Sequence, residues 1–249
     1  MIILKNSREI ELLKKANQIV VEAFKFAESR IRPGVRTDEL DEQIGQFIVS
    51  RGGRPAFKGY NGYPSNVCIS IDDQVVHGIP GARRLKEGEI VSLDIGVECQ
   101  GYYGDAAKTY SIGEISKEKA RLLAVTRESL FKGIDKARQG NRLYDISHAI
   151  QVHVENAGFS VVRDLVGHGI GKELHEPPQI PNYGEPHRGP RLRDGMVLAI
   201  EPMVNMGGWE VRTESDRWTV VTSDGLPSAH FEHSVLITDH EPVILSSGI

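Results

Sequence analysis

Residues 89–112 read EIVSLDIGVECQGYYGDAAKTYSI, two strand-like segments separated by turn residues. If they form a hairpin that turns at Cys99-Gln100, Asp94 and Asp105 lie directly opposite one another with both side chains on one face. Like charges that face each other destabilise a sheet unless a shared cation neutralises them. The alternative is that one aspartate is exposed on an edge strand and the other marks a turn. The hairpin alone leaves both interpretations open.

The elements around this hairpin occur in the same order twice. Apolar residues at helical spacing, bounded by capping and stop residues, predict helices over 7–29, 37–50, 116–138 and 143–156. Apolar runs predict strands over 67–71, 75–79, 89–97, 106–112, 160–165, 196–204, 217–221, 231–237 and 242–246. The stretches 58–65 and 176–193 are expected to be loops. Two helices followed by strands, repeated once, indicate two similar α+β halves.

The composition excludes several classes of protein. A chain of 249 residues can bury a substantial core, as one large domain or two tightly packed halves. A net charge of −4 does not indicate a nucleic-acid binder. The two cysteines lack the spacing of a zinc or redox motif and favour a reducing compartment. The N-terminus lacks the pattern of a signal peptide, and no apolar run is long enough to span a bilayer, so we expect a cytoplasmic protein.

Two glutamates stand in apolar strands. Glu201 interrupts the run 196–204, MVLAIEPMV, where a charge without a partner is costly. Pro202 indicates a strand edge or a bulge at this point. Glu232 begins the apolar run that follows Phe231. The alternative for each glutamate is an ion pair with a nearby arginine.

Three histidines lie beside glycines. His168 and His175 occur in VGHGIGKELHEPP (166–178), whose glycines argue against a helix and favour close approach of the backbone to a ligand. His77 ends an apolar strand in VVHGIP (75–80). Each histidine alone is equally compatible with an ordinary packed or exposed side chain.

Together the acidic residues and one histidine form a hard, oxygen-rich set of candidate ligands. Such a set suits two divalent cations better than one tetrahedral zinc, and paired cations are a common apparatus for activating water. The sequence therefore predicts a metallohydrolase. The candidate ligands are Asp94, Asp105, His168, Glu201 and Glu232.

The motifs that carry these residues resemble those of a known family. VCISIDDQVVHGIP, SLDIGV, GDAAKT, VGHGIG, HEPP, AIEPMV and AHFEHSVLIT occur in the order found in type I methionine aminopeptidases of the bacterial type. The resemblance covers essentially the whole chain. It implies an α+β pita-bread (creatinase/aminopeptidase) fold with two pseudo-symmetric halves around a central antiparallel sheet. Residues 1–249 are expected to form a single metallopeptidase catalytic domain.

The resemblance also implies a role for each candidate residue. The five candidate ligands match the family's dinuclear site, in which Asp105 and Glu232 bridge both metals. Glu201 would also shuttle a proton, and His77 and His175 would contact the substrate and stabilise the tetrahedral intermediate. The implied methionine pocket is lined by Tyr60, Tyr63, Cys68, His77, His175 and Trp218, together with Phe57 and Leu174.

The implied activity is that of a methionyl aminopeptidase. A water activated by two metal ions, which could be Co, Mn, Fe, Ni or Zn, would attack the first peptide bond of a nascent protein whose second residue is small. His175 and Glu201 are only 26 positions apart (201 − 175), and no zinc-finger extension precedes the first helix, which favours the compact bacterial form. We expect a cytoplasmic monomer with transient ribosome association and no membrane or direct nucleic-acid binding. The stretch 205–225, where some relatives carry ribosome-docking lysines, has no lysine.

Two other functions remain to be distinguished. An X-Pro aminopeptidase or prolidase shares the fold and the five ligands, although such enzymes usually carry a large additional N-terminal domain. A catalytically inactive pita-bread protein that binds ribosomes or RNA would lack a competent metal site. Creatinase-like amidinohydrolases do not need the metal ligands, so the intact set argues against them.

Overall fold

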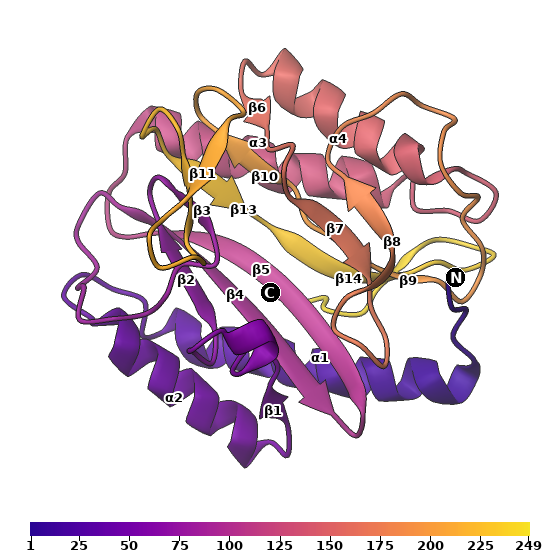
Figure 1. The fold of residues 1–249 in the computed structure, drawn as a ribbon, viewed down its shortest axis with the longest axis horizontal. Coiled ribbons are helices and arrows are strands. Elements are labelled where there is room, and N and C mark those ends of the chain that lie inside the picture. Colours follow the sequence, from indigo (N-terminus) through magenta and orange to yellow (C-terminus); the bar gives the residue numbers. More distant parts are fainter.

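An antiparallel sheet forms the centre of the computed structural model, which describes residues 1–249 (Figure 1). Its nine strands are β1 (Arg54–Pro55), β2 (Cys68–Ile71), β4 (Ile90–Cys99), β5 (Tyr102–Ser111), β7 (Val166–Gly169), β8 (Glu176–Pro181), β9 (Val197–Ile200), β14 (Glu232–Leu236) and β15 (Val243–Ile244). The order is β1-β4-β5-β14-β9-β7-β8, with β2 paired to β4 and β15 paired to β14. Strands from both halves of the chain therefore meet at the β5–β14 pair.

Two small sheets flank the central one. The first has the order β13-β10-β6 and the second β11-β12-β3. Their strands are β3 (Gln74–Val76), β6 (Ser160–Val161), β10 (Met203–Asn205), β11 (Val211–Thr213), β12 (Val220–Thr222) and β13 (Ser228–His230).

The predicted helices are present, with small differences at their ends. They are α1 (Ser7–Glu28), α2 (Thr37–Ser50), α3 (Lys117–Ile134) and α4 (Leu143–Asn156), with a short 3-10 turn, η1 (Tyr60–Gly62). Asn6 caps α1 in a reciprocal capping box with Glu9. Helix α2 begins at Thr37 after the N-cap residue Arg36, and the Thr37 hydroxyl donates a hydrogen bond to the Gly81 carbonyl oxygen. The third helix stops four residues before the predicted Arg138, where the chain tightens into turns.

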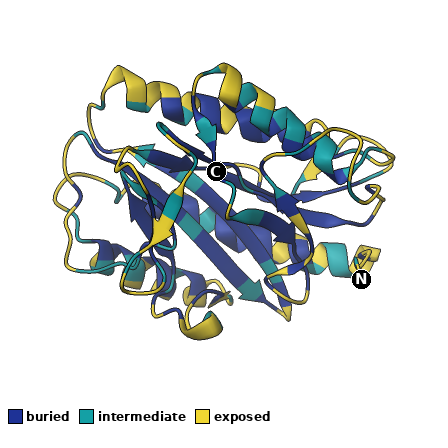
Figure 2. Cartoon of the chain, turned by 45° about the horizontal axis from the view of Figure 1, so that its top comes forward, coloured by how far each residue is buried: buried dark blue, intermediate teal, exposed yellow.

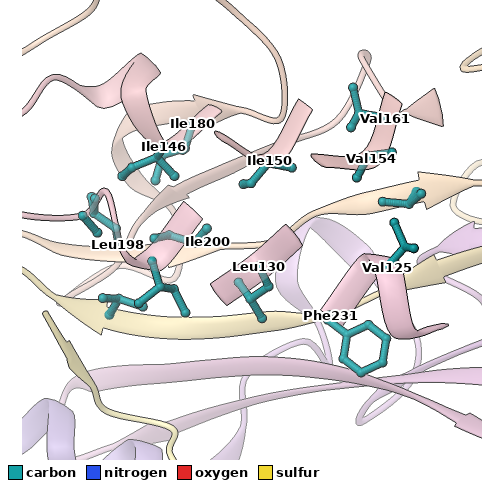
Figure 3. Close-up of a cluster of buried hydrophobic side chains, with 14 of the residues drawn as sticks. Val125, Leu130, Ile146, Ile150, Val154, Val161, Ile180, Leu198, Ile200 and Phe231 are labelled. Carbon is teal, nitrogen blue, oxygen red and sulfur yellow. The ribbon is translucent and has the colours of Figure 1, made fainter. Parts of the chain in front are cut away.

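Each half buries its own apolar core between a helix pair and the sheet. One core joins α1 and α2 to β2, β4 and β5, and the other joins α3 and α4 to β9 and β14. Figure 3 shows the second core, where Ile146 and Ile150 of α4 and Leu130 of α3 lie near Leu198 and Ile200 of β9. The strands are mostly buried, whereas the outer faces of the helices are exposed (Figure 2). The expected pair of α+β halves is confirmed.

The register of the β4–β5 hairpin corrects the predicted one. The turn is Gln100-Gly101 and not Cys99-Gln100, and both turn residues have positive φ, 55° and 81°. Such two-residue turns match the twist of the strands, and glycine tolerates them best. Asp94 consequently pairs with Ala107, while Asp105 pairs with Gly96. The aspartates are diagonal neighbours, still on one face because the register differs by two residues.

The stretch 176–193 is also not a single loop. Its first six residues form β8, which pairs with β7 and alternates between buried and exposed side chains from Glu176 to Ile180. Because prolines at 177, 178 and 181 are unusual in a strand, the sequence pattern did not predict β8. They are tolerated because β8 is an edge strand, bonded on one side only.

Helix α1 packs closely on β5 at a glycine. A Cβ added at Gly104 would lie 2.7 Å from the Asn17 nitrogen and 2.8 Å from the Ala16 carbonyl carbon. These backbone atoms cannot rotate away, so Gly104→Ala should destabilise the fold by about 1–3 kcal/mol. Thermal unfolding should show a Tm lower by roughly 2–4 °C for each kcal/mol. Gly81→Ala is the matched control, since a Cβ there meets nothing within 4 Å; equal Tm values for the two variants would contradict the prediction.

None of the helices has the length and apolar content needed to cross a membrane.

Candidate active site

A cavity of about 220 Å³ opens beside the central sheet and collects every residue that the sequence singled out. All five candidate metal ligands reach it, as do all eight residues of the predicted methionine pocket. Asn61 also lines the cavity and was not predicted. The lining residues are Phe57, Tyr60, Asn61, Tyr63, Cys68, His77, Asp94, Asp105, His168, Leu174, His175, Glu201, Trp218 and Glu232.

Neighbouring strands bring the candidate ligands together. Asp94 lies on β4, Asp105 on β5, Glu232 at the start of β14, and His168 on β7. Glu201 follows β9 at the point where the chain leaves the central sheet and enters β10. The run 196–204 is thus two strands of different sheets and not one interrupted strand. Pro202 marks this break in the sequence. Because Glu201 lies at the break, the alternation of side chains along β9 does not fix the direction of its side chain.

The ligand atoms lie close to one another. Asp105, His168 and Glu232 each offer one atom, and these atoms lie within 4.8 Å of each other. Nε2 of His168 is 3.6 Å from Oε1 of Glu201. Nδ1 of His168 is 2.8 Å from the Gly169 carbonyl oxygen, which requires the proton to be on Nδ1. The Nε2 lone pair is therefore directed to the site, as a metal ligand requires.

The carboxylates of the site lack the partners that buried acids need. One oxygen each of Asp94, Asp105 and Glu232 is buried without a hydrogen-bond partner. No lysine or arginine forms an ion pair with any of them, and Glu201 has only imidazole nitrogens, of His168 and His230, within 4 Å as basic neighbours. Buried charges are paired or coordinate metals. The donor set and its orphaned oxygens therefore fit divalent cations.

The pKa values record the same deficit of positive charge. Burial raises the pKa of Asp94 to about 7 and that of Glu201 to about 8. Burial and then the neighbouring carboxylates raise the pKa values of Asp105 and Glu232 well above their usual range. Burial lowers the pKa of His168 to about 3, which keeps the imidazole neutral at physiological pH. A bound cation would favour the ionised carboxylates and the neutral imidazole.

Aromatic and histidine side chains form the rest of the cavity. The Tyr60 hydroxyl lies 2.7 Å from Nδ1 of His175, whose ring centre is 4.2 Å from that of His168. The Trp218 ring meets Tyr63 edge-on at 5.2 Å and His77 at 6.4 Å. His77 has a φ of 59°, a left-handed conformation that turns it out of strand β3.

Cys68 completes the apolar part of the cavity wall. Burial raises the pKa of its thiol well above the usual range. A thiol that stays protonated is a small apolar group and not a metal ligand.

Besides Asn61, the sequence analysis missed a histidine beside the candidate ligands. His230, at the end of β13, is buried, and its Nε2 lies 3.6 Å from Oε2 of Glu201 with no hydrogen-bond partner. The available signal was its position two residues before Glu232. Nothing in the sequence alone distinguished it from an ordinary core histidine.

Comparison with known proteins identifies the family. The profile of metallopeptidase family M24 matches residues 11–239. The chain belongs to this family. A methionine aminopeptidase of Clostridium perfringens is 54% identical over 246 residues, which cover 99% of each chain. The crystal structure of a methionine aminopeptidase from Thermotoga maritima superimposes with a TM-score of 0.97 at 48% identity, covering 99% of each chain.

A more distant M24 structure shares the fold alone. A prolidase from Pyrococcus furiosus superimposes with a TM-score of 0.80 at 24% identity, covering 98% of this chain and 65% of that one. These structures confirm the expected pita-bread architecture. The two methionine aminopeptidases confirm the expected family. As an M24 metallopeptidase, the protein is a metal-dependent hydrolase that uses divalent cations.

Proposed function

We propose that this protein removes the initiator methionine from new polypeptides whose second residue is small. The observation that carries the proposal is the single cavity in which a cluster of metal-ligating side chains adjoins an apolar pocket. The relatives named methionine aminopeptidase support the same activity. We further propose that residues 1–249 form one catalytic domain.

Two divalent cations are proposed for the site. The residues that would hold them are Asp94, Asp105, His168, Glu201 and Glu232. When bound, such cations lower the pKa of a water molecule, polarise the scissile carbonyl and anchor the free α-amine of the substrate. The donor set admits Co, Mn, Fe, Ni and Zn, whose affinities follow the Irving–Williams order, and the ion that occupies the site also depends on its availability.

The protein's own groups move the protons and orient the substrate. Glu201, with a pKa of about 8 before metal binding, would take a proton from water and pass it to the leaving amine. His175 would donate a hydrogen bond to the scissile peptide from Nε2, because the Tyr60 hydroxyl can donate to its Nδ1. His77 lines the same cavity and would contribute the second such bond.

The apolar part of the cavity would receive the methionine side chain. Phe57, Tyr63 and Leu174 are buried there beside Trp218. Contacts between a thioether sulfur and aromatic rings are favourable, and a cavity of about 220 Å³ has room for one long side chain. Bulk at the second residue would then meet the wall around the metal cluster.

The proposed substrates imply the partners of the protein and the compartment in which it acts. Nascent polypeptide N-termini are the partners, and we propose a cytoplasmic monomer that associates transiently with ribosomes. The two free, buried cysteines are compatible with a reducing compartment.

The test is peptide hydrolysis by metal-stripped protein with Mn²⁺ or Co²⁺ added back. We expect release of methionine from Met-Ala-Ser and a kcat/KM for Met-Ile-Ser lower by about 100-fold or more, as when substrate bulk meets a closed wall. A chelator should abolish both activities. Cleavage of Ala-Pro-Ser in place of Met-Ala-Ser would indicate an X-Pro peptidase instead. If no peptide is cut with either metal, the protein is a binding module.

A further inference from the structure

A buried ion pair joins the N-terminal arm to the loop that carries His175. Nζ of Lys5 lies 2.5 Å from Oε2 of Glu176, and the two side chains are only 3% and 5% exposed. The residues are 171 positions apart in the sequence. Glu176 directly follows His175 and is the first residue of β8.

The second oxygen of Glu176 closes the loop 171–176 on itself. Its Oε1 accepts hydrogen bonds from the backbone nitrogens of Lys172, at 2.8 Å, and Glu173, at 3.4 Å. Gly171 packs against the pair so closely that a Cβ there would lie 2.5 Å from Nζ of Lys5. One carboxylate therefore links both ends of the loop.

The loop has few other contacts. The Tyr103 backbone nitrogen donates to the Gly171 carbonyl oxygen at 2.9 Å, and the Gly171 nitrogen donates to the Glu173 carbonyl oxygen at 3.1 Å. Lys172, Glu173 and His175 are exposed, and only Leu174 is buried between them. The His175 ring has a single hydrogen bond, between its Nδ1 and the Tyr60 hydroxyl. His175 thus lies between two anchors, the buried Leu174 and the carboxylate of Glu176, and only the second is tied to the N-terminal arm.

The energetics of the pair point to orientation and not to stability. Moving two charges out of water costs about as much as their attraction returns, so a buried pair adds little net stability. The pair does impose one geometry, because each charge must meet its partner. That geometry sets where the loop presents His175.

We propose that Glu176, held by Lys5, is a positioning residue that places His175 against the scissile peptide. The N-terminal arm is then part of the catalytic apparatus, although it does not touch the cavity. This inference rests on the proposed function only for the role of His175; the effect on the loop does not depend on it.

Three variants of the metal-loaded enzyme separate orientation from stability. Lys5→Met leaves the carboxylate buried and unpaired. Adding Glu176→Gln neutralises that charge and retains an acceptor for the loop, whereas adding Glu176→Leu neutralises it and removes the acceptor. Lys14→Met is the matched control, since that lysine forms an exposed pair with Glu11 on α1.

The readouts are kcat and KM for Met-Ala-Ser and hydrogen exchange of a peptide spanning 170–176. We expect Lys5→Met to lower kcat by about 10–100-fold with KM changed less than about threefold, as a small misplacement of a catalytic group does. Adding Glu176→Gln should restore kcat to within about threefold, and adding Glu176→Leu should not. Exchange at Lys172 and Glu173 should be faster by about 10-fold or more in the two impaired variants and unchanged in the control.

Wild-type kcat and exchange in folded Lys5→Met/Glu176→Leu protein would overturn the proposal. If that variant does not fold, the other two decide: equal kcat and equal exchange in Lys5→Met and Lys5→Met/Glu176→Gln would overturn it. Should wild-type protein cleave no peptide, the proposed function fails, and the exchange measurement still tests the role of the pair in the loop.

Discussion

Glu201→Gln is expected to lower kcat/KM for Met-Ala-Ser by about 10³-fold or more. Proton transfer by a positioned side chain contributes typically about 10²–10⁴-fold, and an amide cannot take a proton from water. The amide also replaces a charged ligand by a neutral one, which weakens metal binding. Both effects lower the rate, and the nearly isosteric change leaves the packing around the break between β9 and β10 intact.

The loss can be divided between these two effects by metal titration. Calorimetry with Mn²⁺ should show weaker binding in the variant, and the rate should stay low at saturating metal because the proton shuttle is missing. Recovery of more than a tenth of wild-type kcat at saturating metal would show that Glu201 acts as a ligand alone. Glu185→Gln, the same change at an exposed side chain, should retain full activity.

The surroundings of Glu201 explain why the side chain suits this role. It lies 3.6 Å from Nε2 of both His168 and His230 through different oxygens, and neither distance is that of a strong hydrogen bond. The carboxylate is therefore oriented without being tightly held. Burial raises its pKa to about 8, close to the pH at which a group must both accept and release a proton.

The sequence predicted the candidate site better than it predicted the strands that build it. Glu201 and Glu232 were recognisable because a charge in an apolar strand needs a reason, and that argument does not require the register. The argument that Asp94 and Asp105 share a face did require it. The register itself depended on a turn one residue further along, at Gln100-Gly101. An error of two residues preserved the face and moved Asp105 from opposite Asp94 to opposite Gly96.

Contacts between distant segments could not be predicted. Strand β8 was hidden by its prolines, whose tolerance there depends on its place at the edge of the sheet. His230 belongs to the site only because β13 ends beside the break at Glu201. Lys5 looked like one more charge before a helix, and its burial against Glu176 arises from tertiary packing alone. Patterns report which residues are unusual, whereas the fold determines what each one meets.

Removing the metal should make stability fall as the pH rises from about 7 to about 8.5. The folded pKa values of Asp94, at about 7, and Glu201, at about 8, exceed those of the unfolded chain, and those of Asp105 and Glu232 are also well above it. The metal-free native state therefore binds more protons than the unfolded state in this range. Each excess proton lowers the free energy of unfolding by about 1.4 kcal/mol per pH unit.

The buried histidines do not reverse this trend. Burial lowers the pKa values of His77 to about 4 and of His168 to about 3. Their contribution to stability is lost as the pH falls below the unfolded value of about 6.5, and it is constant above it. Between pH 7 and 8.5 the carboxylates dominate, and one excess proton over this range costs about 2 kcal/mol. We therefore expect the Tm of metal-free protein to fall by at least about 4–8 °C, taking roughly 2–4 °C for each kcal/mol.

Bound cations replace those excess protons, so the stability of the metal-loaded protein should not fall with pH in this way. At a metal concentration about 1,000 times Kd, binding stabilises the native state by roughly 4 kcal/mol, which corresponds to a Tm higher by about 8–16 °C. The gain should grow with pH, because fewer protons compete for the ligands. Scanning calorimetry at pH 7, 7.75 and 8.5, with chelator or with Mn²⁺, measures how the Tm depends on pH in the metal-free and the metal-loaded protein. A metal-free Tm that stays constant or rises over this range would mean that the four carboxylates are already paired, and a cation would then have no deficit of charge to fill.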